Sequence, residues 1–255
     1  MKNQIIVNAD DFGLTESCSL AIAKAFRQGL ISSTTACANG AYIREAYQLA
    51  LQNGFADRIG IHINLTEGAP LTEQIRNDPF FCANGKFHGH INRLKKPTKA
   101  QKEEVREEVT AQINKLREIG FDLSHADSHH HIHTDVFLEK TIAEVLLQSG
   151  IKKIRLHRNI GNIAFYKKLV KNWYNRKLKW QGFLTTECMG AAEDWKVISD
   201  SQRNHLCEIM VHPDFDKQGR LIDRVDYEDE IPVGADLKEL AELFAGKEKI
   251  SYREF

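Results

Sequence analysis

The feature that most constrains the fold of this chain is a regular alternation of strand-like and helix-like segments. Strand-like runs at residues 4–10 and 32–40 are each followed by an amphipathic stretch, and the alternation recurs about seven times along the chain. Later strands are expected at residues 151–158 and, at the end of the chain, 248–255. Such a pattern is typical of α/β proteins, in which helices cover a parallel sheet. With 255 residues and no linker-like segment, we expect a single domain, residues 1–255, with a (β/α) barrel-like fold of about seven or eight strands. A doubly wound open sheet is the alternative, although no G-x-G-x-x-G follows the first strand.

Residues 66–97 interrupt the alternation. This stretch carries prolines and polar residues without a clear period, so we expect a long insertion loop, which in a compact fold is usually functional or mobile. After it, a capping box of Thr98 and Gln101 predicts the start of a helix that ends at Gly120.

Charge and composition narrow the class of partner. Lys+Arg and Asp+Glu both number 35, so no basic excess points to nucleic acid or to an anionic membrane. No apolar run reaches the roughly 18 residues of a membrane span, and the N-terminus lacks the pattern of a signal peptide. The five cysteines are scattered without a CxxC pair, which is typical of free thiols in a reducing compartment. We therefore expect a cytoplasmic protein.

Polar residues fall where predicted strands end. Asp10 and Asp11 close the first strand, His62 lies in the third, and His212 ends a late one. In barrels of this kind the carboxyl ends of the strands meet at one mouth, where active sites form. Each residue taken alone has an ordinary structural interpretation, such as a capping aspartate or a buried histidine. Together they predict a site.

A histidine cluster strengthens this prediction. Four of the five residues 129–133 are histidines, interrupted by Ile132, and they follow Asp127. The cluster favours a metal or proton-transfer site, because two imidazoles and one carboxylate leave open positions on a divalent ion for water and substrate. Such an ion lowers the pKa of its water and polarises a carbonyl. Of two adjacent aspartates, one can then bind the ion while the other accepts the proton of the water.

These motifs resemble those of the YdjC-like carbohydrate deacetylases, a family that includes chitooligosaccharide deacetylases. The similar segments are "IIVNADDFGLT", "GLISSTTACANG", "GIHINLTEGAPL", "HADSHHHIH", "IRLHR" and "EIMVHP". The resemblance implies a (β/α) barrel-like fold and a hydrolase that removes acetyl groups from N-acetylated sugars, such as chitooligosaccharides. It also implies one divalent ion per chain, Mg²⁺ or Zn²⁺. We further expect a small sugar substrate and a homodimer.

The resemblance also implies roles for individual residues. It makes Asp11, His62 and His129 the metal ligands. Asp10 is the expected general base, and His212 is the candidate that protonates the leaving amine. Further residues are expected to line the site or to support it: His131, His133, Asn64, Asp127 and Arg155.

Other functions use similar residues. A different metal-dependent hydrolase, an amidohydrolase or a phosphoesterase, usually carries H-x-H on its first strand, where this chain has Asp10 and Asp11. A glycosidase needs two carboxylates about 5 or 9 Å apart across the sugar, which adjacent aspartates fit less well. A non-catalytic protein that binds metal or sugar would not need a second carboxylate beside the ligand.

Overall fold

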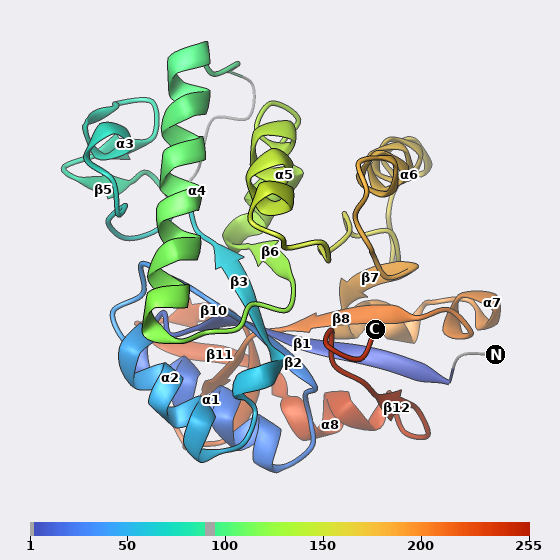
Figure 1. The fold of residues 1–255 in the computed structure, drawn as a ribbon. Helices are drawn as coiled ribbons and strands as arrows, with labels where there is room; N and C mark the ends of the chain where they lie inside the picture. Colours follow the sequence, from blue (N-terminus) through green and yellow to red (C-terminus); the bar gives the residue numbers. More distant parts are fainter. Residues whose placement is uncertain (1–2, 90–94) are drawn as a thin grey trace.

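The computed structural model describes residues 3–89 and 95–255, and at its centre is a curled parallel sheet that forms a half-barrel (Figure 1). In this part of the chain the sheet has seven strands, in the order β6-β3-β2-β1-β8-β7, with β12 also paired to β1. They are β1 (Gln4–Phe12), β2 (Ser33–Ala36), β3 (Ile59–Ile63), β6 (Ala126–Ser128), β7 (Cys188–Ala191), β8 (Cys207–Val211) and β12 (Glu248–Lys249). The predicted barrel-like α/β fold is therefore confirmed.

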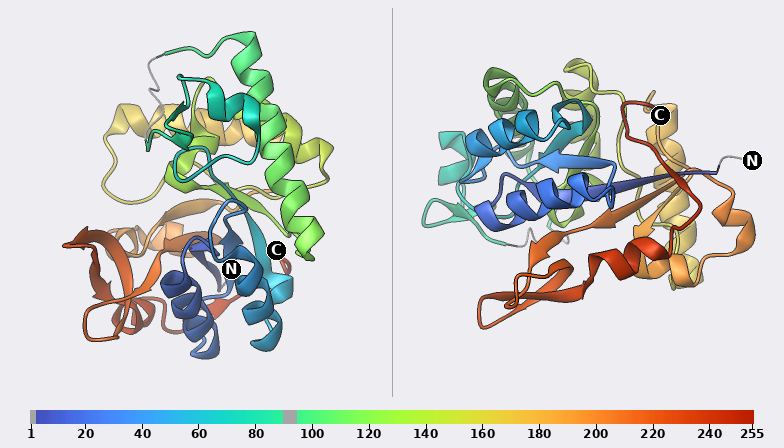
Figure 2. Two further views of the ribbon diagram at one scale, coloured as in Figure 1. Left: turned by 90° about the vertical axis from the view of Figure 1, so that its left-hand side faces the viewer. Right: turned by 90° about the horizontal axis from the view of Figure 1, so that it is seen from below.

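Helices surround this sheet (Figure 2). The α-helices are α1 (Glu16–Arg27), α2 (Ile43–Gln52), α3 (Glu73–Asn77), α4 (Lys99–Ile119), α5 (Glu139–Gln148), α6 (Phe165–Trp180), α7 (Asp200–Arg203) and α8 (Leu237–Glu242), and the 3₁₀ helices are η1 (Ala56–Arg58), η2 (His129–Thr134) and η3 (Ala192–Lys196). The predicted capping box of α4 is confirmed, because the Thr98 side chain accepts from the backbone N–H of Gln101 and the Gln101 side chain accepts from that of Thr98. Gly120 follows the helix with a φ of 121°. Glycine adopts this conformation at little steric cost because it has no Cβ.

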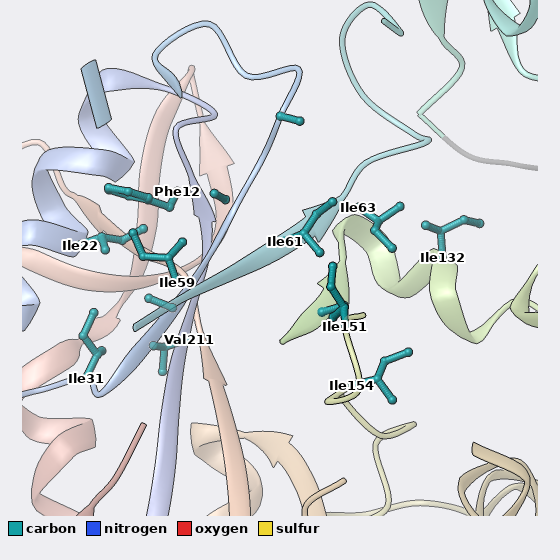
Figure 3. Close-up of a cluster of buried hydrophobic side chains, with 14 of the residues drawn as sticks. Phe12, Ile22, Ile31, Ile59, Ile61, Ile63, Ile132, Ile151, Ile154 and Val211 are labelled. Carbon is teal, nitrogen blue, oxygen red and sulfur yellow. The ribbon is translucent and has the colours of Figure 1, made fainter. Parts of the chain in front are cut away.

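The apolar core lies between the sheet and its helices. Every residue of β1 after Gln4 is buried, as expected for a parallel strand covered on both faces. Figure 3 shows Ile59, Ile61 and Ile63 of β3 within one cluster that also includes Ile22 of α1. This packing fixes the strands whose carboxyl ends carry the polar residues.

One predicted strand is wrong. Residues 151–158 form only the isolated bridges Ala126–Ile154 and Lys153–Leu184. Each bridge pairs the segment with a different neighbour, so no continuous ladder develops between β6 and β7. The segment instead places the side chain of Arg155 in the interior, where it is fully buried.

The chain end also departs from the prediction. The expected terminal strand over residues 248–255 is limited to β12. Beyond it, the backbone N–H of Tyr252 donates to the Ser33 hydroxyl at 3.0 Å, and the Tyr252 side chain is fully buried. The chain bends away from β1 because this tyrosine packs inward rather than continuing the ladder.

The insertion after β3 contains several short elements. It contains α3, β4 (Cys82–Ala83) and β5 (Lys86–Phe87), and residues 90–94 of the predicted loop lie outside the described part of the chain.

A second, antiparallel sheet was not predicted. It follows β8 and consists of β9 (Pro213–Phe215), β10 (Leu221–Glu228) and β11 (Ile231–Asp236), in the order β11-β10-β9. This small sheet lies beside the carboxyl end of β1, since Arg224 of β10 contacts Asp11.

Candidate active site

A cavity of about 390 Å³ opens at the carboxyl ends of β1, β3, β6 and β8. Six of the residues predicted from the sequence line it: Asp10, Asp11, His62, His129, His131 and His212. The other four, Asn64, Asp127, His133 and Arg155, are not among its lining residues; Asn64, Asp127 and Arg155 are fully buried and His133 is 1% exposed. The cavity therefore gathers the carboxylates and imidazoles of four strand ends.

Asp11 is the centre of the polar cluster. Its Oδ1 atom lies 3.2 Å from His62 Nε2 and 2.8 Å from His129 Nδ1, while Oδ2 accepts from Arg224 at 2.6 Å. Burial alone would raise the pKa of Asp11, but hydrogen bonds with His129 and His62 lower it well below its usual range. Its φ of 71° is uncommon for a residue with a side chain and changes the direction of the backbone at the end of the strand. The result is a permanent carboxylate facing two imidazoles.

His62 is oriented from behind. Its Nδ1 lies 2.6 Å from Asp127 Oδ1, the partner residue on β6, and this leaves Nε2 directed at Asp11. Burial would lower the pKa of His62, but Asp127 and Asp11 raise it to about 10. A carboxylate that fixes one ring nitrogen so that the other faces the site is the arrangement of metal-binding histidines.

His129 joins the cluster from the start of η2. Its Nδ1 faces Asp11 and its Nε2 lies 2.9 Å from Glu67 Oε2. The pKa of His129 would fall through burial, but hydrogen bonds with Asp11 and Glu67 raise it to about 9. The next two residues, His130 and His131, have φ of 50° and 54°. This left-handed turn keeps both beside the cavity, whereas His133 is directed to the Ser128 hydroxyl at 2.5 Å.

Asp10 has a different environment from its neighbour. Arg155 holds it in a bidentate pair, with Nη1 and Nη2 each 2.6 Å from one carboxylate oxygen. Burial would raise the pKa of Asp10, and the charge and hydrogen bonds of Arg155 lower it instead. Arg155 also contacts Asp127 at 2.8 Å and, through Nε, Glu208 at 2.7 Å. Asp10 is thus a carboxylate with a fixed orientation.

His212 stands on the other side of Asp10. Its Nε2 lies 3.8 Å from Asp10 Oδ2 and its Nδ1 lies 3.9 Å from Asp223 Oδ1, and its side chain is 30% exposed. Burial and then the charge of Arg155 lower the pKa of His131 to about 3. His131 is therefore a neutral imidazole near pH 7, which is a much weaker acid than an imidazolium.

Some residues of the site were missed by the sequence analysis. Glu67 and Glu208 lie within the quoted motifs "GIHINLTEGAPL" and "EIMVHP", so their position beside the site was available, although no role was given to them. Arg224 and Tyr252 lie outside every motif. The Tyr252 hydroxyl donates to Glu208, and Arg224 also pairs with Asp214 at 3.3 Å. Only the folded arrangement connects these residues with the site.

In the described part of the chain, two sets of donor atoms have all their members within 4.8 Å of one another: Asp11 with Cys37 and His62, and Asp10 with His62 and Asp127. The predicted set of Asp11, His62 and His129 is not one of them. In the second set, both carboxylates, Asp10 and Asp127, already form ion pairs with the guanidinium of Arg155. The positive charge of Arg155 would repel a metal cation there. In the first set, burial raises the pKa of the Cys37 thiol well above its usual range. Both sets share His62 with the predicted ligand set.

Comparisons with known proteins identify related sequences. A family model described as "YdjC-like protein" matches residues 4–245. A carbohydrate deacetylase of Vibrio parahaemolyticus is 30% identical, over 84% of this chain and 80% of its own length. A carbohydrate deacetylase of Vibrio campbellii is 39% identical over 57% of this chain, and a chitooligosaccharide deacetylase of Yersinia enterocolitica is 40% identical over 52%. These two matches span about half of the relatives' own lengths, 56% and 51%.

A solved structure has the same fold. The crystal structure of a protein from Enterococcus faecalis V583, described as a candidate for cellobiose-phosphate cleavage, superposes with a TM-score of 0.72 and 22% identity. The superposition covers 100% of this chain and 99% of that one.

In the described part of the chain, every helix is too short or too polar to span a bilayer.

Proposed function

Because this chain belongs to the YdjC-like family, we propose that it is a hydrolase that removes acetyl groups from N-acetylated carbohydrates, such as chitooligosaccharides. The relatives named carbohydrate deacetylase and chitooligosaccharide deacetylase support this assignment. The observation that carries this proposal is that the two adjacent carboxylates have different environments. Asp11 faces two imidazoles, while Asp10 is held by an arginine and lies near a third imidazole.

Asp11, His62 and His129 are the residues that would hold a divalent ion. Their donor set, one carboxylate and two imidazoles, suits Zn²⁺ and leaves positions open, and Mg²⁺ is the alternative. The fixed orientation of His62 by Asp127 supports this use, as does the convergence of both rings on one oxygen of Asp11. When bound there, such an ion polarises the acetamide carbonyl and lowers the pKa of a water molecule.

Asp10 is the proposed general base. It is ionised near neutral pH, it lines the cavity, and it directly precedes Asp11 in the sequence. As the water oxygen attacks the acetyl carbon, Asp10 takes a proton from that water. The bidentate contact with Arg155 keeps the carboxylate in one orientation, which limits the entropy lost in aligning base and water.

His212 is the proposed proton donor to the leaving group. As the C–N bond breaks, the sugar nitrogen needs a proton to leave as an amine, and His212 is half-buried at the edge of the cavity next to Asp10. Asp223 accepts from the backbone N–H of His212 at 2.6 Å and so fixes its position. His131 is the other candidate by location, but its lowered pKa leaves it unprotonated at neutral pH. The products are acetate and an amino sugar.

The test is an acetate-release assay on a panel of N-acetylated monosaccharides and disaccharides, with and without added Zn²⁺ or Mg²⁺. We expect release from at least one of them and a loss of roughly two to four orders of magnitude in Asp10→Asn. Asp200→Asn, at a fully exposed position on α7, is the matched control and should keep the wild-type rate. A metal-replete wild type that releases no acetate, but binds the sugars, would support a non-catalytic binding protein instead. Hydrolysis of phosphate esters alone would support a phosphoesterase.

A further inference from the structure

The β10–β11 hairpin has an extra residue in one of its strands. Between Arg224 and Asp226 the register with β11 shifts by one residue, so Val225 has no partner there. Such a β-bulge changes the direction of the side chains that follow it, and bulges are frequent beside active sites. In a regular strand, residues 224 and 227 would point to opposite faces of the ribbon. The bulge shifts this alternation, and the side chains of Arg224 and Tyr227 therefore share a face, where they are hydrogen-bonded to each other.

Gly234 of β11 makes the bulge possible. It is the partner of Arg224, and a Cβ atom at this position would lie only 1.8 Å from the carbonyl oxygen of Asp223. Any residue with a side chain would push the two strands apart. A glycine within a strand often marks a bulge or a close approach of another backbone, and here it marks both.

Arg224 connects the bulged strand with the site, beside the end of β1 (Figure 1). Its Nη2 donates to Asp11 at 2.6 Å, and its Nη1 donates to Asp214 at 3.3 Å and to the Tyr227 hydroxyl. Its guanidinium carbon also lies 5.0 Å from the centre of the Tyr227 ring. The backbone N–H of Arg224 donates to the carbonyl of His212 at 2.9 Å. One arginine thus holds an aromatic ring beside the carboxylate that we expect to bind the ion.

Tyr227 remains open to the cavity. It is 49% exposed in spite of its contacts with Arg224, and it lines the cavity together with Val225 and Asp226. The ring offers an apolar surface, and the exposed carboxylate of Asp226 accepts hydrogen bonds. A pyranose ring has the matching chemistry, because one of its faces carries C–H groups and its edge carries hydroxyl groups. Neither Tyr227 nor Asp226 has a part in the proposed reaction.

We propose that Tyr227 is a sugar-binding residue whose ring stacks on the pyranose ring that carries the reacting acetamide, and that Asp226 accepts hydrogen bonds from hydroxyl groups of the same sugar. This assignment rests on the proposed function for the identity of the ligand. The position favours the reacting sugar over a more distant one, because Tyr227 and Asp11 are bound to the same guanidinium. The acetamide nitrogen is bonded directly to the sugar ring, so an acetamide that reaches Asp11 brings that ring beside Tyr227.

Sugar binding tests the assignment without turnover. Isothermal titration calorimetry on the Asp10→Asn chain with Zn²⁺ present measures the Kd of N-acetylglucosamine and of its β-linked disaccharide. Adding Tyr227→Ala should raise both Kd values by at least about tenfold, because it removes the stacking surface. Adding Tyr227→Phe keeps the ring and should leave both Kd values within about threefold of the parent. Asp226→Ala should raise both by about tenfold, since it removes a charged acceptor.

The matched control is Tyr166→Ala, a 66% exposed tyrosine on α6 that does not line the cavity, and it should leave both Kd values unchanged. The zinc content of each variant after dialysis, measured by atomic absorption, separates sugar binding from support of Asp11 through Arg224. It should be the same in Tyr227→Ala as in its parent.

Several results would overturn the assignment. Unchanged Kd values in Tyr227→Ala would do so, as would the absence of binding of either sugar to the parent. Equal losses in Tyr227→Ala and Tyr227→Phe would assign the effect to the hydroxyl and not to the ring. A loss of zinc together with sugar binding would make Tyr227 a positioning residue for Arg224. A loss confined to the disaccharide would move the contact away from the reacting sugar.

The proposed reaction can fail separately from this site. A wild type that binds both sugars through Tyr227 but releases no acetate refutes the reaction and leaves the sugar-binding site in place. A wild type that releases acetate with a KM that Tyr227→Ala does not change refutes the site and leaves the reaction in place.

Discussion

Replacing Arg155 by methionine is expected to destabilise the fold by about 3–5 kcal/mol, the usual cost of removing one partner of a buried ion pair. The guanidinium is fully buried and lies within 2.6–2.8 Å of carboxylate oxygens of Asp10, Asp127 and Glu208. Methionine approximates the apolar part of the side chain but leaves these carboxylates without a counter-charge. Because three acids share one cation, the range given for a single pair is a lower limit.

The loss should depend on pH with a defined sign. Burial raises the pKa of Asp10, but Arg155, together with smaller effects of His62 and His212, lowers it below its usual value. In the wild type, this carboxyl contributes stability above its unfolded pKa of about 4 and loses that contribution as the pH falls through the lower folded value. Without Arg155, only the smaller effects of His62 and His212 oppose burial. We therefore expect the folded pKa to lie above the unfolded one, so that the carboxyl becomes destabilising as the pH rises. The difference between variant and wild type should therefore shrink from pH 7 toward pH 4.

Urea unfolding followed by tryptophan fluorescence at pH 7 and pH 5 measures this difference through the midpoint and slope of each transition. Arg253→Met is the matched control, because Arg253 is 39% exposed and pairs with Asp122 at 2.8 Å on the surface; it should cost less than about 1 kcal/mol. Arg155→Lys keeps the charge without the bidentate geometry and should fall between the two, which preserves the comparison if Arg155→Met does not fold. Equal costs for Arg155→Met and Arg253→Met would refute the reasoning.

Further predictions concern the site. Chelation should abolish acetate release and added divalent ions should restore it, since the proposed chemistry has no covalent nucleophile; full turnover after chelation contradicts this. Asp10→Asn should keep its metal content while Asp11→Asn loses affinity for metal and regains part of its rate at high metal concentration; equal loss of metal in both variants would make both aspartates ligands. His212→Asn should lower kcat by roughly two to four orders of magnitude, and His131→Asn by less, as measured by initial rates; the reverse order would move the proton donor to His131. Tyr252→Phe should cost about 1–3 kcal/mol in urea unfolding, because it leaves the buried Glu208 with one bond fewer; a neutral effect contradicts it.

The sequence predicted those parts of the structure that follow local rules. Alternating segments gave the parallel sheet, and the capping box at Thr98 gave the start of α4. The expectation that strand ends meet at one mouth brought Asp11 and His62 together, and they lie 3.2 Å apart. These predictions succeeded because hydrophobic period, helix caps and parallel topology each depend on few neighbouring residues.

Long-range pairing could not be predicted in the same way. Arg155 was expected near the site, but the apolar run around it suggested a strand, whereas the chain forms isolated bridges. Its three acidic partners come from β1, β6 and β8, which no local pattern connects. The β10–β11 hairpin was missed for another reason: its turn is Asp229-Glu230 and lacks the glycine or asparagine that usually marks such a turn.

Backbone strain is concentrated at two places in this structure, the cavity and the β10–β11 hairpin. In the described part of the chain, six residues other than glycine have a positive φ: Asp11, Asn84, His130, His131, Asp229 and Glu230. Asp11, His130 and His131 line the cavity, and Asp229 and Glu230 form the tip of the β10–β11 hairpin. Glycine would adopt these conformations at lower cost but supplies neither carboxylate nor imidazole. Each such residue costs on the order of 1 kcal/mol or more, which the buried strands around it must offset. Residues with a backbone conformation against local preference therefore concentrate at the cavity and at the tip of the β10–β11 hairpin. The sequence motifs placed Asp11 and His131 at the site, but local preference could not predict the backbone conformation of these residues.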